Sequence, residues 1–405
     1  MSGDETHDRA TSGSHLAVGN PSHLTPLELA VSRTLGVERR PPLQRSAPES
    51  PELSLERILE PAVAGGRCVV SFSGGRESAW LLAAATSAAR RHGHPDPVPA
   101  TLRRGGAASR RESEHQERIV RHLGLEDWER IDVGDDLELL GPYARRALSE
   151  AGILFPAHLY VFLPLLDLAR GGALLAGGVL TDFFIYWRWA RLSEVIGLRR
   201  RPRRRDLREL AVAALPRRAR RAILRPERGL EPPAWLRPDA AREAQRLLLS
   251  QFGDIPVSFA AAMSSQRTHR CHTATRESLD ALGAAAGARF LMPLRDDRYV
   301  AAVAAAGGRR GFGDRSTTAE RLAGSVLPVE LLQRSDGAGD RYATVGDATR
   351  AFLDTWSGAG LDSEVVDVAV LRDTWSSGDV PYASTMLLQA AFATERASMK
   401  KVGQA

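Results

Sequence analysis

The sequence predicts an α/β fold in which helices cover both faces of a parallel sheet and a mostly α-helical half follows. Two observations support this prediction. Between residues 53 and 190, short apolar runs alternate with amphipathic helical segments, a pattern typical of parallel strands that are buried on both faces. After residue 190, the apolar residues recur with a helical period through most of the chain.

Four apolar runs are expected to form the strands of the sheet. They are RCVVSFS (67–73), DPVPATL (96–102), DWERIDV (127–133) and ALLAGGV (173–179). The helices expected around them are LSLERILEPAV (53–63), ESAWLLAAATSAARRHG (77–93), SEHQERIVRHLGL (113–125) and ILFPAHLYVFLPLLDLARG (153–171). Because ligands bind beyond the carboxyl ends of parallel strands, the turns SGGRES (73–78) and GGVLTDFF (177–184) are expected at one edge of the sheet.

The chain is expected to form one domain with an N-terminal tail. Residues 1–50, rich in Ser, Pro, Gly, Thr and charge, predict a disordered or weakly structured tail with one semi-apolar piece, LTPLELAVSRTLGV (24–37). Within 51–405, we expect an α/β part (51–190), a basic helical segment (191–250) and a helical part (251–405). The helical runs expected after residue 190 are RPDAAREAQRLLLSQF (237–252), TATRESLDALGAAAGA (273–288), DDRYVAAVAAAGG (296–308), TAERLAGSV (318–326) and STMLLQAAFATERAS (384–398).

Arginine supplies nearly all of the positive charge. Only Lys400 and Lys401 are lysines among the 55 basic residues, so arginine is the default cation of this chain. The segment Arg199–Arg221 still carries a net charge of +9, because its eleven arginines face only Asp206 and Glu209. It is either a solvated helical face or a surface for nucleic acid or a phosphorylated partner. The lack of interleaved aromatic residues favours the solvated face, and nucleic acid is not an expected partner.

The turn SGGRES is suited to holding phosphate. A strand leaves the sheet, Gly74 and Gly75 allow the backbone to approach a ligand closely, and a helix begins whose first amides and dipole attract an anion. Ser73 and Ser78 add hydroxyl donors. Glu77 would repel phosphate unless a divalent cation lay between them, and Mg²⁺ is the cation that carboxylates and phosphates bind together. The alternative is an ordinary turn between a strand and a helix.

Several segments resemble the synthetase domain of the asparagine synthetase family. FSGGRES resembles its SGGxDS pyrophosphatase loop, and LARGGALLAGGVLTDFF lies where the family has a strand and a G-x-G-x-D-E-x-F turn. ESEHQERIVRHLG, FLMPLRDDRYVAAVAAAGG and LPVELLQRSDGAGD resemble its second helix, its P-F/L-x-D segment and its helical end. The resemblance covers roughly residues 53 to 392 and implies a sheet of the adenine-nucleotide alpha hydrolase (PP-loop) type.

The resemblance implies an ATP-dependent, amide-forming enzyme. In this family, ATP activates a carboxylate as an acyl-adenylate, and an amine then attacks it, with release of AMP and pyrophosphate. ATP and Mg²⁺ are therefore the expected cofactors, and the expected partners are a small-molecule or peptide carboxylate with an amine or ammonia acceptor. The family's N-terminal glutaminase domain has no counterpart in the tail-like first 50 residues, so ammonia would come from elsewhere. The resemblance assigns ATP to Ser71, Ser73, Gly74, Gly75, Glu77 and Ser78, and the metal to Glu77 and Asp182.

The sequence departs from the family pattern at three positions. Glu77 replaces the aspartate of SGGxDS, and Thr181 replaces the first acid of G-x-G-x-D-E, which leaves Asp182 as the catalytic and metal-binding carboxylate. Asp336 stands where the family has a lysine that stabilises pyrophosphate, although Arg334 or Arg341 lies close by in the chain. The alternative function is therefore a catalytically degenerate homologue that binds ATP or a partner protein without turnover.

Other candidate residues have weaker signals. Tyr186 lies just past the second motif, where it would line an acyl-acceptor pocket as a catalytic residue or belong to a buried aromatic cluster. His158 is either a site residue or a structural one. The cluster of His269, Cys271 and His272 lacks the further ligands that a zinc site requires, so packing is expected.

The sequence also predicts where the protein resides. Two cysteines, Cys68 and Cys271, make no disulfide framework, and the N-terminus has no secretory signal, so a cytoplasmic location is expected. No apolar run approaches the length of about 20 residues that a membrane helix needs, so no membrane partner is expected.

Overall fold

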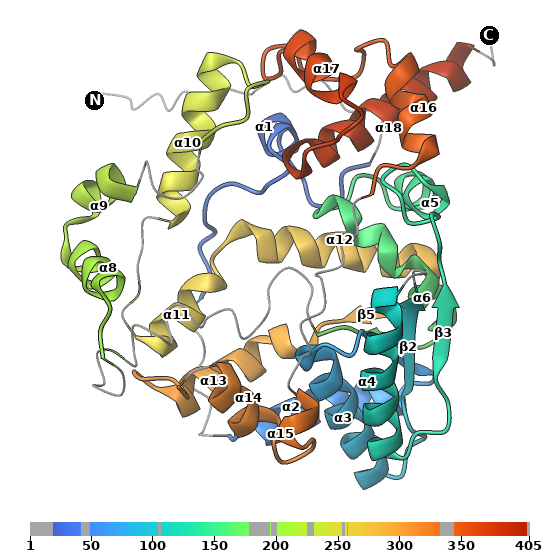
Figure 1. Cartoon of the computed structure of the whole chain (residues 1–405), viewed down its shortest axis with the longest axis vertical. Helices are drawn as coiled ribbons and strands as arrows, with labels where there is room; N and C mark the ends of the chain where they lie inside the picture. The colour runs from blue at the N-terminus through green and yellow to red at the C-terminus, as the bar shows by residue number, and fades with distance from the viewer. Residues whose placement is uncertain are drawn as a thin grey trace, which may run out of the picture.

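A five-stranded parallel sheet lies at the centre of the structured chain, in the order β3-β2-β1-β4-β5 (Figure 1). The computed structural model describes residues 19–41, 49–103, 107–177, 195, 201–224, 231–252, 256, 258–313, 315–332 and 344–402. The strands are β1 (Cys68–Ser71), β2 (Val98–Arg103), β3 (Glu129–Asp132), β4 (Ala173–Leu175) and β5 (Arg289–Leu291). The predicted parallel α/β sheet is confirmed, and all four runs expected to form strands belong to it.

The order of the strands reverses at β1. The chain first builds outward through β2 and β3 and then returns to the other side of β1 for β4 and β5. In parallel sheets of this kind, the ligand crevice lies outside the carboxyl ends of the strands, where the strand order reverses. The turns that follow β1 and β4 are therefore neighbours at this crevice.

Helices cover both faces of the sheet. Val69 and Val70 of β1 are both fully buried and belong to different hydrophobic clusters, because successive side chains of a strand point to opposite faces. The cluster on the Val70 face is formed with α2 (Pro51–Ala64), α3 (Arg76–Arg91) and α13 (Asp297–Gly307). The cluster on the Val69 face is formed mainly with α5 (Pro142–Glu150), α6 (Leu163–Leu168) and α12 (Arg270–Ala286).

The sheet and the helices packed on it differ from the expected elements in three places. The single apolar helix expected over 153–171 is divided into a 3-10 helix, η1 (Ala157–Phe162), and α6, whose first turn contains Pro164. Proline lacks the amide proton that a helix interior needs and is favoured in the first turn, which agrees with a new helix beginning there. Helix α5 was not anticipated, and neither was β5, which is too short to display a strand period.

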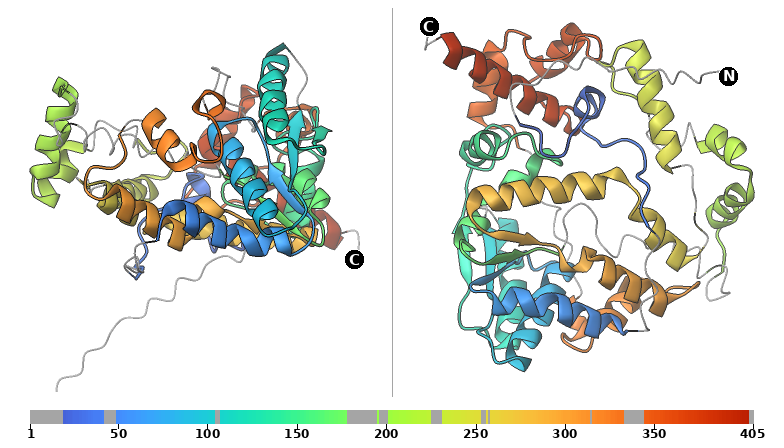
Figure 2. Two further views of the ribbon diagram at one scale, coloured as in Figure 1. Left: turned by 90° about the horizontal axis from the view of Figure 1, so that it is seen from below. Right: turned by 180° about the vertical axis from the view of Figure 1, so that it is seen from behind.

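The C-terminal half is mostly helical, as predicted, and α12 runs between the sheet and the outer helices (Figure 2). None of the described helices combines the length and apolarity needed to cross a membrane. The remaining elements are α4 (Ala107–Leu123), α8 (Arg204–Ala214), α9 (Arg217–Leu224), α10 (Pro238–Phe252), α11 (Phe259–Gln266), η3 (Pro293–Arg295), α14 (Arg315–Ala323), α15 (Val329–Leu332), α16 (Asp347–Thr355), α17 (Val368–Ser376), η4 (Tyr382–Ser384) and α18 (Thr385–Val402).

The expected N-terminal tail is wrong for residues 19–41, which pack into a third hydrophobic cluster with α10, α17 and α18. This part contains the semi-apolar piece 24–37 and a short helix, α1 (Pro26–Ala30). The Trp235 indole N–H donates to the Ala30 carbonyl at 2.9 Å, and the Met386 amide donates to Ser32 Oγ at 2.9 Å. Apolar residues too sparse to form a core alone are buried here by partners more than 200 residues away in the chain.

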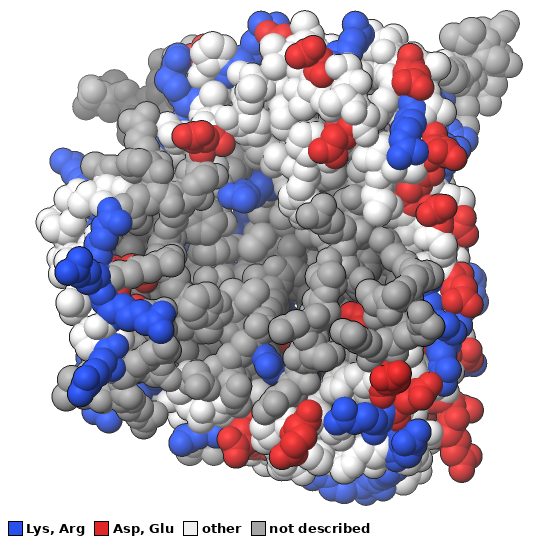
Figure 3. Space-filling view, in the orientation of Figure 1, with Lys and Arg blue, Asp and Glu red and all other residues white. Residues whose placement is uncertain are grey.

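The described part of the basic segment forms α8 and α9 at the periphery of the molecule. Arginine side chains gather over these helices on the left edge of the space-filling view (Figure 3). Leu207 is 53% exposed and Arg208 is exposed as well, so this helical surface faces solvent. Asp206 is buried instead and accepts a hydrogen bond from the Arg203 amide at 2.8 Å, which caps α8.

Candidate functional site

The turn between β1 and α3 is anchored at its first residue. Phe72 is buried, and its amide donates to the Ala100 carbonyl at 2.8 Å, which extends the pairing of β1 with β2. The Thr101 hydroxyl donates to the Phe72 carbonyl at 2.6 Å and accepts from the Trp128 indole N–H at 3.0 Å. The chain therefore leaves the sheet at a fixed point, directly after the half-buried Ser71.

Two serine hydroxyls close the turn into a ring of hydrogen bonds. The Gly75 amide donates to Ser73 Oγ at 3.3 Å, and Ser78 Oγ donates to the Gly75 carbonyl at 2.9 Å. The hydroxyls of Ser73 and Ser78 lie 3.2 Å apart, and the Ser73 amide also donates to Ser78 Oγ at 3.2 Å. Since Ser78 uses its only proton on Gly75, the Ser73 hydroxyl is the donor between the two. The three hydrogen bonds that a serine oxygen accepts are long, at 3.2–3.3 Å. Phosphate oxygens can therefore take the place of these serine oxygens as acceptors.

Gly74 is required by the backbone of the turn. Its φ of +73° lies in the left-handed region that side chains disfavour. A Cβ at this position would also lie 2.7 Å from Cγ of Gln116, on α4. The sequence pattern identified the glycine, but the neighbouring Gln116, buried beside the turn, was not among the predicted site residues.

The N-terminus of α3 is open to an anion. The helix begins after Gly75, and no side chain among the described residues caps it. The amides of the first turn have no carbonyl partner within the helix, and the dipole of a helix of 16 residues favours negative charge at this end. These groups are the usual means by which a helix N-terminus binds phosphate.

Glu77 lies where the turns after β1 and β4 meet. Its side chain is buried, and its backbone touches Gly177, two residues beyond the end of β4. A Cβ at Gly177 would lie 3.1 Å from the Glu77 carbonyl oxygen and 3.2 Å from its Cβ. The structure therefore places Gly177, the one described residue of the second predicted turn, against Glu77 of the first.

A third segment reaches the same site. The Arg76 Nε donates to the carbonyl of Leu332, the last residue of α15, at 3.0 Å. Leu332 directly precedes residues 333–343, which include Asp336 and lie outside the described residues. Burial lowers the Arg76 pKa, and the nearby Glu77 carboxylate opposes this shift.

A buried tyrosine lies beneath the site. The ring of Tyr299, from α13, is 5.8 Å from that of Trp80 on α3. Burial raises the Tyr299 pKa well above its usual range, and the charges of Glu52 and Glu77 add to the shift. Tyr299 is thus a neutral neighbour of Glu77 across the whole physiological pH range.

The remaining predicted site residues lie outside the described residues. They are Asp182 and Tyr186, together with Thr181 of the second turn and Arg334 and Arg341 near Asp336. Among the residues that the structure describes, no group of three or more His, Cys, Asp or Glu side chains is arranged to bind a metal ion. Glu77 is the one predicted metal ligand whose position is described.

The histidines singled out in the sequence lie away from the turn. Burial lowers the pKa of His158 to about 4, and its ring lies 6.3 Å from that of Tyr382. His272 Nδ1 accepts a hydrogen bond from Arg295 at 3.0 Å, and burial raises the pKa of the neighbouring Cys271 to about 11. His269 precedes α12, and burial lowers its pKa as well.

No family model matches the chain, and no curated protein is significantly similar to it.

Proposed function

We propose that this protein is an ATP-dependent, amide-forming enzyme of the asparagine synthetase type, with a sheet of the PP-loop class. The observation that carries the proposal is the convergence of three segments at the N-terminus of α3. The turn after β1, Gly177 after β4 and Leu332 before residue 333 are in contact or hydrogen-bonded there. These are the three segments in which the resemblance locates the nucleotide loop, the metal-binding turn and the pyrophosphate contact.

The residues of the turn fit the triphosphate of ATP. The amides of Gly75 and of the first turn of α3 would donate to phosphate oxygens, and the Ser73 and Ser78 hydroxyls would exchange their mutual hydrogen bond for bonds to phosphate. Glu77 would bind Mg²⁺ together with Asp182 and the phosphates. Bound Mg²⁺ would offset the repulsion between the Glu77 carboxylate and the nucleotide.

The chemistry would follow the family reaction. An oxygen of the substrate carboxylate attacks the α-phosphorus of ATP, and pyrophosphate leaves. The amine would then attack the acyl carbon and lose a proton to solvent, and AMP would leave with the electrons of the broken C–O bond. The amides at the N-terminus of α3 would hold the phosphates in place during the first step, and such fixed donors stabilise developing negative charge.

A second candidate function is nucleotide binding without turnover. Asp336 supplies negative charge where a cation would assist pyrophosphate release, and the chain has no lysine before Lys400. A missing charged contact of this kind costs about 10²–10³ in rate. In this case the protein would serve as an ATP-binding or partner-binding subunit of a biosynthetic pathway.

Calorimetric titration with ATP, with and without Mg²⁺, tests the nucleotide site. We expect binding that strengthens with Mg²⁺ and weakens at least about tenfold in Ser78→Ala, since a hydrogen bond to a charged group contributes about 1.5–3 kcal/mol. Glu77→Gln should abolish only the effect of Mg²⁺. Ser87→Ala, a partly buried serine further along the same helix, is the matched control. Equal affinity in wild type and Ser78→Ala would reject the site.

Pyrophosphate release then separates the two candidate functions. Hydroxylamine, a small nucleophile, would convert an acyl-adenylate to a hydroxamate and release AMP. With a mixture of carboxylic acids, stoichiometric pyrophosphate, AMP and hydroxamate would support the amide-forming enzyme. Magnesium-dependent ATP binding without any of these products would support the non-catalytic subunit.

A further inference from the structure

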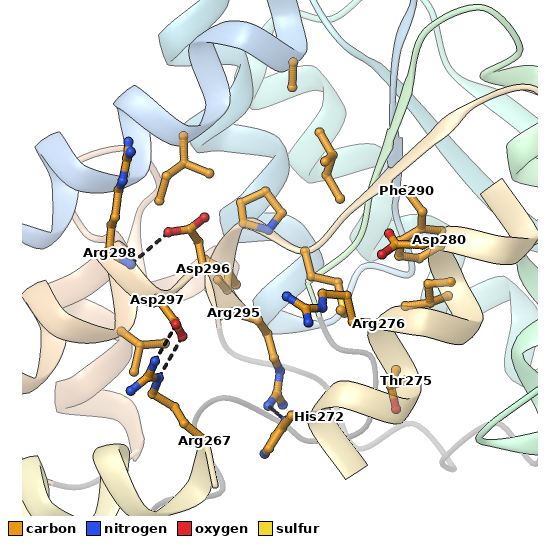
Figure 4. Close-up of a pocket in the computed structure, with 18 of the residues that line it drawn as sticks. Arg267, His272, Thr275, Arg276, Asp280, Phe290, Arg295, Asp296, Asp297 and Arg298 are labelled. Carbon is orange, nitrogen blue, oxygen red and sulfur yellow. Dashed lines mark hydrogen bonds and ion pairs between the residues drawn. The ribbon is translucent and has the colours of Figure 1, made fainter. Parts of the chain in front are cut away.

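A cavity of about 650 Å³ lies beside β5, the last strand of the sheet (Figure 4). It is bordered by α2 and α12, by the chain from β5 into α13, by the end of α11 and by Arg40 of the N-terminal segment. None of the residues of the turn between β1 and α3 lines it. The volume is that of a typical site for a small organic ligand.

The lining of the cavity carries a positive charge. It includes seven arginines, three aspartates and no lysine or glutamate. Asp297 is bound by the guanidinium of Arg267, and Asp296 caps α13 by accepting from the Arg298 amide at 2.8 Å. Burial raises the pKa of the third acid, Asp280, and Arg276 opposes this shift. Two of the three carboxylates are thus already engaged within the protein.

Two arginine side chains of the lining have no such partner. Among the described residues, the guanidinium groups of Arg276 and Arg298 make neither a hydrogen bond nor an ion pair. Arg276 extends from α12 toward Arg295 in the close-up, so two cations from different elements approach each other (Figure 4). Arginine is common in this chain, but a cavity whose lining holds seven arginines and only three carboxylates is well suited to an anion.

Two neutral donors on α12 are buried without partners in the described structure. His272 accepts from Arg295 at Nδ1, so the ring proton lies on Nε2, which is buried and makes no hydrogen bond. Burial and the charge of Arg295 keep this ring neutral, with a pKa of about 3. Thr275 is 1% exposed, and its hydroxyl also lacks a partner. Both residues line the cavity from one face of the helix, since positions three apart lie side by side.

The opposite part of the lining is apolar. Helix α2 contributes Ile58 and Ala62, and the segment from β5 to α13 contributes Leu291, Leu294 and Val300. A ligand that fills the cavity would thus place an apolar body against α2 and its charged group against α12. Arginine guanidinium groups bind carboxylates and phosphates through paired donors.

We propose that this cavity is a binding site for a small organic anion, a carboxylate or phosphate ester with an apolar body. Arg276 would bind the charged group beside Arg295, and the Thr275 hydroxyl and His272 Nε2 would donate the hydrogen bonds that they lack in the free protein. The side chain of Arg298 extends from α13 toward α2, away from this group (Figure 4). The site is separate from the proposed nucleotide turn and does not depend on the proposed enzymatic activity.

Phenyl phosphate is a suitable probe, because it combines a dianion with an apolar ring. In calorimetric titrations we expect saturable binding that weakens with added salt, weaker binding of inorganic phosphate and none of phenol. Arg276→Gln should lower the affinity about 10- to 100-fold, the range for a charged hydrogen bond, whereas Arg298→Gln should lower it less. Arg309→Gln, an exposed arginine outside the lining, should leave it unchanged.

Thr275→Val distinguishes a ligand-binding role from a structural one. Because its hydroxyl has no partner in the described structure, the valine should leave the melting temperature of the free protein unchanged or higher, yet weaken phenyl phosphate binding. Ser78→Ala should not alter that binding, which separates the cavity from the turn. No binding to the wild type, or an affinity of Arg276→Gln equal to that of the wild type, would overturn the proposal. So would a loss of affinity confined to Ser78→Ala.

Discussion

The backbone of Glu77 lies against Gly177, so that a Cβ added at Gly177 would be 3.1 Å from the Glu77 carbonyl oxygen. Gly177→Val should therefore displace the turn after β1. We expect a loss of about 1–3 kcal/mol in the free energy of unfolding, as for other overpacked sites, together with weaker ATP binding. Urea denaturation and calorimetry measure the two effects. Gly19→Val, where nothing lies within 4 Å of the added Cβ, is the control; equal losses in both variants would contradict this contact.

Gly74 combines two separable constraints, a left-handed backbone and contact with Gln116. Gly74→Ala should cost about 1–2 kcal/mol for the backbone alone, with a further cost from Gln116. In a Gln116→Ala background, the further cost should disappear while the backbone cost remains. A double-mutant cycle measured by urea denaturation gives the coupling, expected within about 0.5–3 kcal/mol.

Gly93→Ala provides the matched control for this cycle. Gly93 has nearly the same conformation, with a φ of +71°, but nothing lies within 4 Å of an added Cβ. Its substitution should cost only the backbone contribution and show no coupling to Gln116→Ala. Coupling of similar size at both glycines would mean that Gln116 does not constrain the turn by contact.

The ion pair between Glu28 and Arg270 should hold the N-terminal segment in place. Glu28 is 2% exposed, accepts from Arg270 Nε at 2.8 Å and also accepts from the Leu35 amide at 2.8 Å. Glu28→Ala leaves the buried Leu35 amide without its acceptor, while the partly exposed Arg270 keeps its bonds to the Ser22 and His23 carbonyls, so we expect a loss of about 1–3 kcal/mol. Glu364→Ala, at an exposed position, should change the free energy of unfolding by less than about 0.5 kcal/mol. A comparable small change for Glu28→Ala in urea denaturation would show that the segment does not depend on this pair.

Acid should destabilise the protein through two histidines. Burial lowers the pKa of His272 to about 3, with Arg295 adding to the shift, and that of His158 to about 4. In the unfolded chain, histidine titrates near 6.5, so below this pH the unfolded state binds protons that the folded state does not. The stabilisation is therefore complete above about pH 6.5 and is lost as the pH falls toward these lowered values. The slope should reach at most about 1.4 kcal/mol per pH unit for each histidine.

Urea denaturation between pH 7.5 and 4.5 measures this slope. His272→Gln and His158→Gln should each reduce the dependence on pH, whereas His122→Gln, an exposed histidine of α4, should leave it unchanged. An unaltered slope in both buried-site variants would assign the acid sensitivity to other groups.

Local sequence determined the elements around the site. The apolar run that ends at Ser71, the two glycines and the helical period from Arg76 onward each act over a few residues, so the strand, the turn and α3 were predictable. Helices α10, α12, α13, α14 and α18 were recognisable for the same reason, whereas α11, α16 and α17 were not among the predicted runs. By contrast, β5 spans only Arg289–Leu291 and has too few residues for a period to show.

Only the tertiary structure decided which distant segments meet. The order of the strands brought Gly177 to Glu77, and burial of Leu29 and Ala30 against α17 and α18 ordered a segment whose composition predicted a tail. The cavity beside β5 likewise joins Arg40, Arg276 and Arg298, which are far apart in the chain. The physical reason is that apolar surface and charge are satisfied by whichever partners the packed fold supplies, and a local pattern does not specify those partners.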